Sequence, residues 1–256
     1  MKALILNSGV GSRMGILTQN RPKGMTEIGG GYTILSRQLE QLSRIGVHKA
    51  VITTGAFADT LRAYVDSLDP DMDIIYAHNP DFAETNYIMS MHLAAPLLEG
   101  RENVLFFHGD LVLEDSVYRD LFDSPYSAVT VDSGLPLPEK DFKARLRDGR
   151  VTAIGVELSG PDCVACQPAY KWLSADFAAW LYSVDAFIRR GETGVYGENA
   201  LNVLTGSLHL HPLELHGRLC GEIDNPQDLA VLGARFMEDL AKQQDATDND
   251  TKAVSE

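Results

Sequence analysis

The sequence predicts an α/β protein with a Rossmann-like mixed, mainly parallel sheet that is flanked by helices. Short apolar runs alternate with amphipathic segments along the first half of the 256 residues, and such alternation forms parallel sheets through right-handed crossovers. The first apolar run ends at a glycine-rich turn, Asn7 to Met14. Polar or glycine residues follow several of the runs, at the strand ends where parallel sheets bind ligands.

The first half supplies strands and helices in strict alternation. Strands are recognised as short apolar runs closed by glycine or polar residues, and helices by apolar residues spaced three and four apart. The predicted strands cover 3–6, 49–54, 73–77 and 104–108. The predicted helices cover 32–45, 58–68 and 88–98, and Asn86 is placed to cap the last one.

The second half has a different pattern, in which predicted strands follow one another across turns. They cover 128–132, 143–146, 151–158 and 164–172. This predicts an inserted, smaller mixed-sheet section that forms a substrate lid over the first half. Helices over 176–190, 199–204 and 227–240 and strands over 208–212 and 217–223 complete the domain. We expect one domain over 1–242, with halves 1–126 and 127–242, and a disordered acidic tail over 243–256.

Composition excludes several classes of function. A formal net charge of −14 argues against a general nucleic-acid or membrane-surface binder. No signal-peptide pattern or membrane-length apolar run occurs, so we expect a cytoplasmic protein. Cys163 and Cys166 have the spacing of a redox pair or of half a zinc site, but no second pair completes one. Buried thiols are therefore favoured. A homo-oligomer is possible, because the sequence does not determine the oligomeric state.

The turn from Asn7 to Met14 offers consecutive backbone N–H groups with little obstruction from side chains. Such a concavity suits the phosphates of a nucleotide. Arg13 can grip phosphate oxygens in a bidentate manner, whereas Lys23 is a mobile point charge. The turn is neither a P-loop nor a dinucleotide-binding loop, because Met14 stands where the latter has its third glycine. A plain loop with scattered surface charge is the alternative.

The motif G-x-G-x-R-M, followed by Pro22-Lys23, resembles the signature of the nucleotidyltransferases that join an NTP to a sugar phosphate, phosphocholine or phosphonate. Members usually have LAAG at the end of the strand and PKP around the lysine. This chain has Leu6-Asn7-Ser8-Gly9 and Pro22-Lys23-Gly24 instead. The departures leave the expected fold unchanged and point away from the sugar-nucleotide subgroup.

Further segments resemble one subgroup of that family. Residues 86–94 look like the N-x-x-x-S-x-x-L-A element of phosphocholine and phosphonate cytidylyltransferases, which helps to build their nucleotide pocket. Asn86 and Ser90 would read a pyrimidine edge; an N-cap and a buried hydroxyl are the alternative roles. Residues 135–144 and 198–202 are similar to the cytidylyltransferase domains found with phosphoenolpyruvate mutases. Pro168 stands where such relatives commonly have glycine, which predicts a reshaped acceptor pocket.

The resemblance also implies a Mg²⁺ site. Asp110 follows one predicted apolar strand and Asp224 another, and either residue alone would be read as a loop aspartate that caps the next helix. Similar cytidylyltransferases have an aspartate after the first of these strands and a second one in a late D-N-x-x-D element, here Asp224 to Asp228. Asp110 and Asp224 are therefore the expected ligands of an ion that neutralises the triphosphate.

The implied reaction transfers CMP from CTP to a small phosphonate or phosphate, such as 2-aminoethylphosphonate or phosphocholine, and releases pyrophosphate. Arg13, Lys23 and Asp110 are the expected catalytic residues. The expected nucleotide-binding residues are Leu6, Asn7, Ser8, Gly9, Gly11, Ser12, Arg13, Met14, Lys23, Thr54, Gly55, Asn86, Ser90, Gly109 and Asp110. The expected acceptor-binding residues are Asp132, Lys143, Tyr196 and Glu198. A solvated lysine and a first-turn helix acid are the alternatives for Lys143 and Glu198.

Three other functions stay open at this level. The acceptor could be a phosphorylated amino acid or amide. The enzyme could instead be a sugar-1-phosphate nucleotidyltransferase that uses UTP or dTTP. A third alternative is a non-catalytic, nucleotide-sensing regulatory subunit, although the presence of Arg13, Lys23, Asp110 and Asp224 speaks against it.

Overall fold

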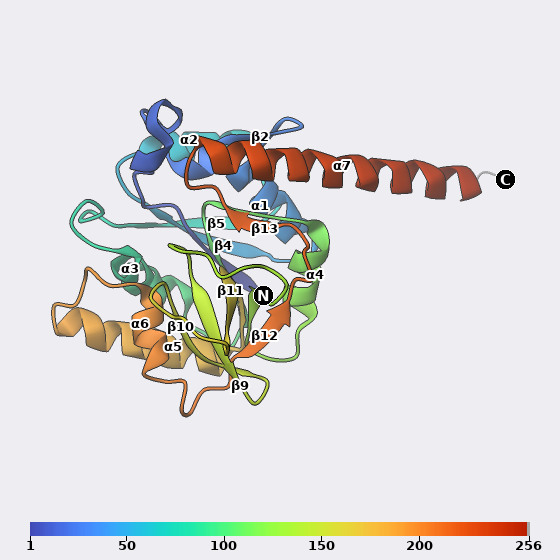
Figure 1. Ribbon diagram of the computed structural model, residues 1–256. Coiled ribbons are helices and arrows are strands. Elements are labelled where there is room, and N and C mark those ends of the chain that lie inside the picture. Colours follow the sequence, from blue (N-terminus) through green and yellow to red (C-terminus); the bar gives the residue numbers. More distant parts are fainter. Residues whose placement is uncertain (255–256) are drawn as a thin grey trace.

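A computed structural model describes residues 1–254, with the side chains of residues 1–244 (Figure 1). Its described residues form a nine-stranded central sheet in the order β10-β9-β11-β6-β1-β4-β5, with β8 beside β11 and β12 beside β8. The strands are β1 Lys2–Leu6, β4 Lys49–Thr54, β5 Asp73–His78, β6 Val104–His108, β8 Ala128–Asp132, β9 Lys143–Arg147, β10 Arg150–Gly155, β11 Cys163–Trp172 and β12 His211–Glu214. The α/β class predicted from the sequence is confirmed.

Helices cover both faces of this sheet. Strand β1 pairs in parallel with β4 and β6, and β4 with β5. Leu4 and Leu6 belong to a core that includes residues of α3 and α5, whereas Ala3 and Ile5 belong to a core with α1, α2 and α4. A parallel sheet buried on both faces needs apolar residues at successive positions, as β1 has. The helices are α1 Ile34–Arg44, α2 Ala58–Leu68, α3 Tyr87–Leu98, α4 Asp115–Asp123, α5 Ser174–Arg189, α6 Gly197–Asn202 and α7 Pro226–Val254.

The strands of the second half extend the main sheet. Strand β11 pairs antiparallel with β6, β8 and β9, so the mixed section expected as an inserted lid is continuous with the parallel part. An unpaired edge of β6 would expose a row of backbone donors and acceptors. Strand β11 pairs with this edge and satisfies those groups. The half over 127–242 thus adjoins the half over 1–126 through β11 and β6.

Smaller elements carry the loops above the sheet. The turn after β1 leads into two 3₁₀ helices, η1 Ser12–Thr18 and η2 Lys23–Met25, and a hairpin of β2 Glu27–Gly29 and β3 Tyr32–Thr33. Strand β7, Leu111–Leu113, pairs antiparallel with β13, Cys220–Glu222. A third apolar cluster, which includes Met14 and Phe236, joins η1 and these strands to α7.

Several predicted bounds differ from those observed. The strand expected over 208–212 begins only at His211 and runs to Glu214, and the strand expected over 151–158 ends at Gly155. Helix α7 continues to Val254 across most of the tail that the sequence predicts to be disordered. Residues 234–254 contain neither glycine nor proline, so nothing local ends that helix.

Two other expectations concern the whole chain. Cys163, Cys166 and Cys220 are buried and unpaired, in line with the prediction of buried thiols. Within the described part of the chain, every helix is too short or too polar to cross a bilayer.

Candidate active site

The β7–β13 ladder brings Asp110 and Asp224 together. Asp110 directly precedes β7, and Asp224 closely follows β13. The strands run antiparallel with Glu222 opposite Leu111, so the start of β7 lies beside the end of β13. The backbone N–H of Ile223 donates to the carbonyl of Asp110 at 3.0 Å and extends this pairing. Two aspartates far apart in sequence thereby face one site.

Lys23 lies between these two carboxylates. Its Nζ donates to Asp110 Oδ2 at 2.7 Å and to Asp224 Oδ1 at 2.5 Å, while Arg13 Nη2 lies 2.9 Å from Asp224 Oδ2. Burial lowers the pKa of Lys23, but the charges and hydrogen bonds of Asp110 and Asp224 outweigh it and raise the pKa. Two cations and two carboxylates therefore form one charged cluster.

Glycines let the turns at the ends of β1 and β6 approach each other closely. Gly11 has φ 63°, in the left-handed region that glycine occupies without steric cost. Gly109 N–H donates to Leu6 O at 2.9 Å, and a Cβ at Gly109 would lie only 2.2 Å from that oxygen. The cavity at these turns has a volume of about 240 Å³. It is lined by Leu6, Asn7, Gly9, Gly11, Ser12, Arg13, Lys23, Gly109 and Asp110.

A second cavity of about 520 Å³ adjoins the first and shares Gly9, Gly109 and Asp110 with it. Within it, Ser8 Oγ and Ser90 Oγ share a hydrogen bond of 2.7 Å. The residues that line only this cavity are Ser8, Val10, Asn79, Phe82, Thr85, Asn86, Tyr87, Ser90 and His108. Hydroxyl and amide groups beside aromatic rings suit the hydrogen-bonding edge and the face of a base.

Three predicted nucleotide-binding residues line neither cavity among the described residues. Met14 is buried in the apolar cluster beneath η1. The hydroxyl of Thr54 is hydrogen-bonded to His78 Nδ1 at 3.1 Å. A Cβ at Gly55 would lie 2.2 Å from Ser8 O, so Gly55 permits the end of β4 to approach the turn. Direct contact of these three with a nucleotide stays a prediction.

The charged residues predicted to bind the acceptor are buried against protein groups. Asp132 accepts the backbone N–H of Gly134 at 2.9 Å and that of Gly217 at 2.8 Å. Lys143 Nζ donates to three backbone carbonyls, at 3.3, 3.2 and 2.5 Å. An ammonium has three donors, so Lys143 has none left over. The three carbonyls belong to Glu139, Asp141 and Val156.

Glu198 and Tyr196 both contact Tyr87, which lines the second cavity. Glu198 is buried and accepts the hydroxyls of Tyr87 and, at 2.7 Å, Tyr170. Tyr196 is 38% exposed, with its ring centroid 5.8 Å from that of Tyr87 and 5.2 Å from that of Phe142. Neither residue lines the two described cavities. The acceptor roles of all four residues stay predictions.

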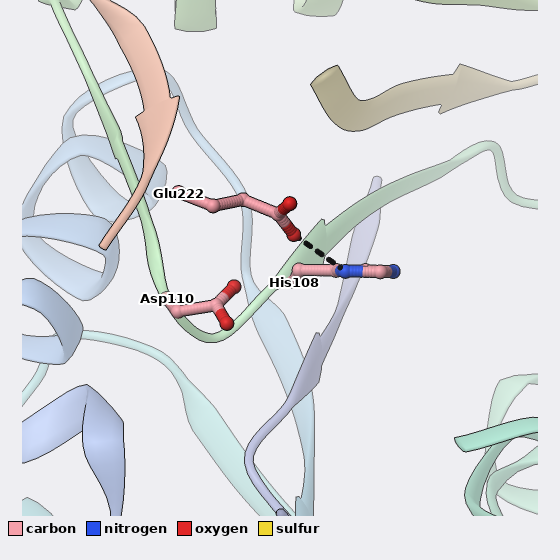
Figure 2. Close-up of side chains that lie close together, drawn as sticks. All are labelled: His108, Asp110 and Glu222. Carbon is pink, nitrogen blue, oxygen red and sulfur yellow. Dashed lines mark hydrogen bonds and ion pairs between the residues drawn. The ribbon is translucent and has the colours of Figure 1, made fainter. Parts of the chain in front are cut away.

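The sequence interpretation overlooked His108 and Glu222, which Figure 2 shows next to Asp110. His108 Nδ1 lies 3.0 Å from Glu222 Oε1, and one ligand atom from each of the three residues lies within 4.8 Å of the others. Burial first, and then the charge of Asp110, raise the pKa of Glu222 to about 7. Burial lowers the pKa of His108, but its bond to Glu222 outweighs this and raises it. His108 and Glu222 each precede one of the two predicted metal-binding aspartates by two residues, and residues two apart in an extended strand lie on the same face. This spacing is the sequence signal that could have identified them.

Comparison with known proteins identifies the family. Residues 3–224 match the MobA-like NTP transferase domain. The chain belongs to this family. It is therefore a nucleotidyltransferase, as its sequence motifs predict.

Several cytidylyltransferases are similar to this nucleotidyltransferase. The choline-phosphate cytidylyltransferase of Streptococcus pneumoniae is 26% identical over 242 residues, which are 91% of this chain and 96% of that protein. The CTP:phosphoglutamine cytidylyltransferase of Campylobacter jejuni is 25% identical over 90% of this chain and 98% of its own. The CMP-5'-(3-aminopropyl)phosphonate synthase of Streptomyces rubellomurinus is 32% identical over 133 residues, but the match spans only 21% of its length.

Solved structures show the same fold. The CTP:phosphocholine cytidylyltransferase of S. pneumoniae superposes with a TM-score of 0.74 at 21% identity and covers 91% of this chain and 97% of that one. The inositol-1-phosphate CTP transferase of T. maritima gives a TM-score of 0.73 at 19% identity, over 91% and 95% of the two chains. Both confirm the architecture predicted from the alternating strands and helices.

Proposed function

We propose that this nucleotidyltransferase transfers CMP from CTP to a small molecule that carries a phosphonate or phosphate, with release of pyrophosphate. The observation that carries the proposal is the meeting of Arg13, Lys23, Asp110 and Asp224 beside the cavity at the glycine-rich turn. Relatives that match about nine-tenths of the chain are cytidylyltransferases of choline phosphate and phosphoglutamine. Both use acceptors whose phosphorus group can attack CTP.

The residues present fit a bound Mg²⁺. Asp110 and Asp224 both lie within hydrogen-bonding distance of one atom, Lys23 Nζ, so one cation can reach both carboxylates. Asp110 Oδ2 and Asp224 Oδ1 already meet at that positively charged atom, as two carboxylate oxygens that share a metal ion would. Asp110 and Asp224 would hold the ion through oxygen atoms, the ligands that Mg²⁺ prefers. When bound, the ion would neutralise the triphosphate.

The chain's own residues would position and neutralise the reacting groups. An acceptor oxyanion attacks the α-phosphorus and forms a P–O bond. The bond from that phosphorus to the oxygen bridging the β-phosphate breaks, and its electron pair leaves with pyrophosphate. Because phosphonates and phosphates are already ionised near neutral pH, no general base is needed. Lys23 and Arg13 would exchange carboxylate partners for phosphate oxygens, so catalysis rests on positioning and electrostatics.

The second cavity supports binding of the nucleoside. Asn86 and Ser90 both line it, as the resemblance to cytidylyltransferases implies. Asn86 Oδ1 accepts the N–H of Tyr87 at 2.8 Å and so caps α3, which leaves its amide nitrogen as the group for a pyrimidine edge. Ser90 Oγ is shared with Ser8 and with Asn79 Nδ2, the latter at 3.1 Å. We propose Asn86 as the reading group and Ser90 as its neighbour in the pocket.

The four residues predicted to bind the acceptor differ in how readily an acceptor could contact them. Tyr196 exposes part of its ring, whereas Asp132, Lys143 and Glu198 would have to exchange protein partners to contact an acceptor. We propose 2-aminoethylphosphonate or phosphocholine as the acceptor class. A phosphorylated amino acid or amide is the alternative that the phosphoglutamine relative favours.

Pyrophosphate release tests the proposal. The enzyme is incubated with Mg²⁺, one of CTP, UTP, dTTP or GTP, and one of 2-aminoethylphosphonate, phosphocholine, phosphoglutamine or glucose 1-phosphate. We expect release with CTP and one of the first three acceptors, and loss of release when EDTA removes the metal. Release only with UTP or dTTP and the sugar phosphate would assign the alternative enzyme. CTP binding without release from any pair would favour a nucleotide-sensing regulatory subunit.

A further inference from the structure

His108, Asp110 and Glu222 form a second group of metal-ligating side chains next to the Asp110–Asp224 pair (Figure 2). The His108 Nδ1 to Glu222 Oε1 distance is 3.0 Å, about the spacing of neighbouring ligands that each lie about 2.1 Å from one ion. One ligand atom from each of His108, Asp110 and Glu222 lies within 4.8 Å of the other two. Three side chains from β6, β13 and the turn between β6 and β7 therefore point toward one small volume.

Asp110 has two carboxylate oxygens, so it can belong both to the Asp110–Asp224 pair and to the group of His108, Asp110 and Glu222. Its Oδ2 accepts Lys23 Nζ, on the side of Asp224, whereas its Oδ1 is buried without a hydrogen-bond partner among the described residues. A buried carboxylate oxygen without a partner costs free energy, which a cation would offset. The surroundings are rich in negative charge, because the half-buried Glu222 lies beside Asp110, and the His108 imidazole is its only hydrogen-bond partner among the described residues. His108 is itself only 8% exposed.

We propose that His108, Asp110 and Glu222 bind a second divalent cation, distinct from the Mg²⁺ of Asp110 and Asp224. An imidazole nitrogen beside two carboxylates favours transition ions such as Mn²⁺, Co²⁺ or Zn²⁺ over Mg²⁺, which prefers oxygen ligands alone. Asp110 would bridge the two ions, the arrangement of two-metal sites. The site goes beyond the proposed reaction, since binding of the ion requires neither CTP nor an acceptor.

The position of this site suggests its role. His108 and Asp110 both line the larger cavity, and Asp110 also lines the smaller one at the glycine-rich turn. An ion held by them lies where the two cavities meet. There it would attract a phosphorus oxyanion from the side opposite Lys23, so its chemical partner is a phosphate or phosphonate group.

Co²⁺ binding to the nucleotide-free enzyme tests the inference. Co²⁺ is titrated into metal-free protein, and its visible absorption and binding isotherm are recorded for wild type and variants. His108→Phe keeps an aromatic ring against Tyr87, Phe106 and Phe142 but removes the nitrogen ligand. Glu222→Gln keeps the shape of the side chain. We expect both variants to lose at least about tenfold in affinity, together with the absorption bands of nitrogen-ligated Co²⁺.

Two controls separate the new site from the Mg²⁺ site and from surface histidines. Asp224→Asn removes one carboxylate of the Mg²⁺ pair and leaves His108, Asp110 and Glu222 in place. His209→Ala removes an exposed histidine that bonds Arg150. Both should retain the nitrogen-ligated Co²⁺ of the wild type.

Unchanged Co²⁺ binding in both His108→Phe and Glu222→Gln would overturn the inference. Equal loss in Asp224→Asn would also overturn it, because the two sites would then be one. Circular dichroism checks the fold, and Glu222→Gln decides if His108→Phe does not fold. The result is independent of turnover: an enzyme that binds Co²⁺ as expected but releases no pyrophosphate would keep the site and refute the proposed function.

Discussion

The charged residues predicted for the nucleotide site in the first half and for the acceptor site in the second half have different partners. At the turns of the first half, Lys23 and Arg13 have only the carboxylates of Asp110 and Asp224 as ion-pair partners among the described residues, and the four groups form one cluster. In the second half, Asp132 is held by backbone N–H groups and Lys143 by backbone carbonyls. The first set can exchange partners with a charged ligand, because each partner is itself a mobile side chain.

This difference shows how a buried charge is to be interpreted. A side chain saturated by the backbone stabilises the local fold, and a ligand could recruit it only by breaking those bonds. Side chains that neutralise one another across a cavity can release each other when a triphosphate and a metal enter. The comparison therefore predicts loss of turnover from substitutions in the first set and loss of stability from those in the second.

The largest effect is expected at the shared contact. Lys23→Ala or Asp110→Asn should lower turnover by more than about a hundredfold, because each removes an electrostatic contact to the transition state. The measurement is pyrophosphate release at saturating CTP and acceptor. Lys140→Ala, which removes an exposed lysine of the second half, is the matched control. Near-normal turnover in a Lys23 or Asp110 variant would refute the role of that residue.

A Lys143 variant tests the prediction that side chains saturated by the backbone stabilise the fold. Lys143→Met should lower the free energy of unfolding by about 1–3 kcal/mol, because three carbonyls lose their donor. Urea denaturation measures it, with Lys140→Met as the control. If unfolding is unchanged and the KM for the acceptor rises alone, the acceptor-binding role predicted from the resemblance is favoured instead.

Two glycines that line the cavity at the glycine-rich turn, Gly9 and Gly109, should differ in their tolerance of a methyl group. Gly109→Ala would place a Cβ 2.2 Å from Leu6 O and should destabilise the fold by about 1–3 kcal/mol through overpacking. Gly9→Ala meets no atom within 4 Å among the described residues and should leave stability unchanged. Thermal unfolding of the two variants is compared with that of the wild type. Equal melting temperatures would contradict the close approach of β1 and β6.

The last prediction concerns the pH dependence of stability. The pKa of Glu222 rises from an ordinary value of 4.5 to about 7 on folding, so the folded state binds the proton more tightly. Its contribution to stability is therefore complete below about 4.5 and is lost as the pH rises through about 7. In metal-free protein, Glu222→Gln should flatten this decline in the free energy of unfolding. An unchanged slope would show that another group titrates there.

Local patterns were enough for much of the fold. Strands β4 and β6 and helix α2 have the predicted bounds, because β4 and β6 are short apolar runs closed by glycine or polar residues and α2 has apolar residues at helical spacing. The glycine-rich turn and the motif at Lys23 were likewise sufficient for the family. Helix α4 and strand β7 were not foreseen, since short elements carry too few residues to show a period.

The sequence by itself determined the alternation of strands and helices, the glycine-rich turn that is predicted to bind phosphates, and the identity of the groups that could carry charge. Only the tertiary structure decided which of those groups meet. Asp110 and Asp224 converge because β7 pairs with β13, whereas Lys143 and Glu198 are saturated by groups that other segments supply. Pairing and saturation depend on residues distant in the chain, and no local pattern of residue types encodes the distance between them.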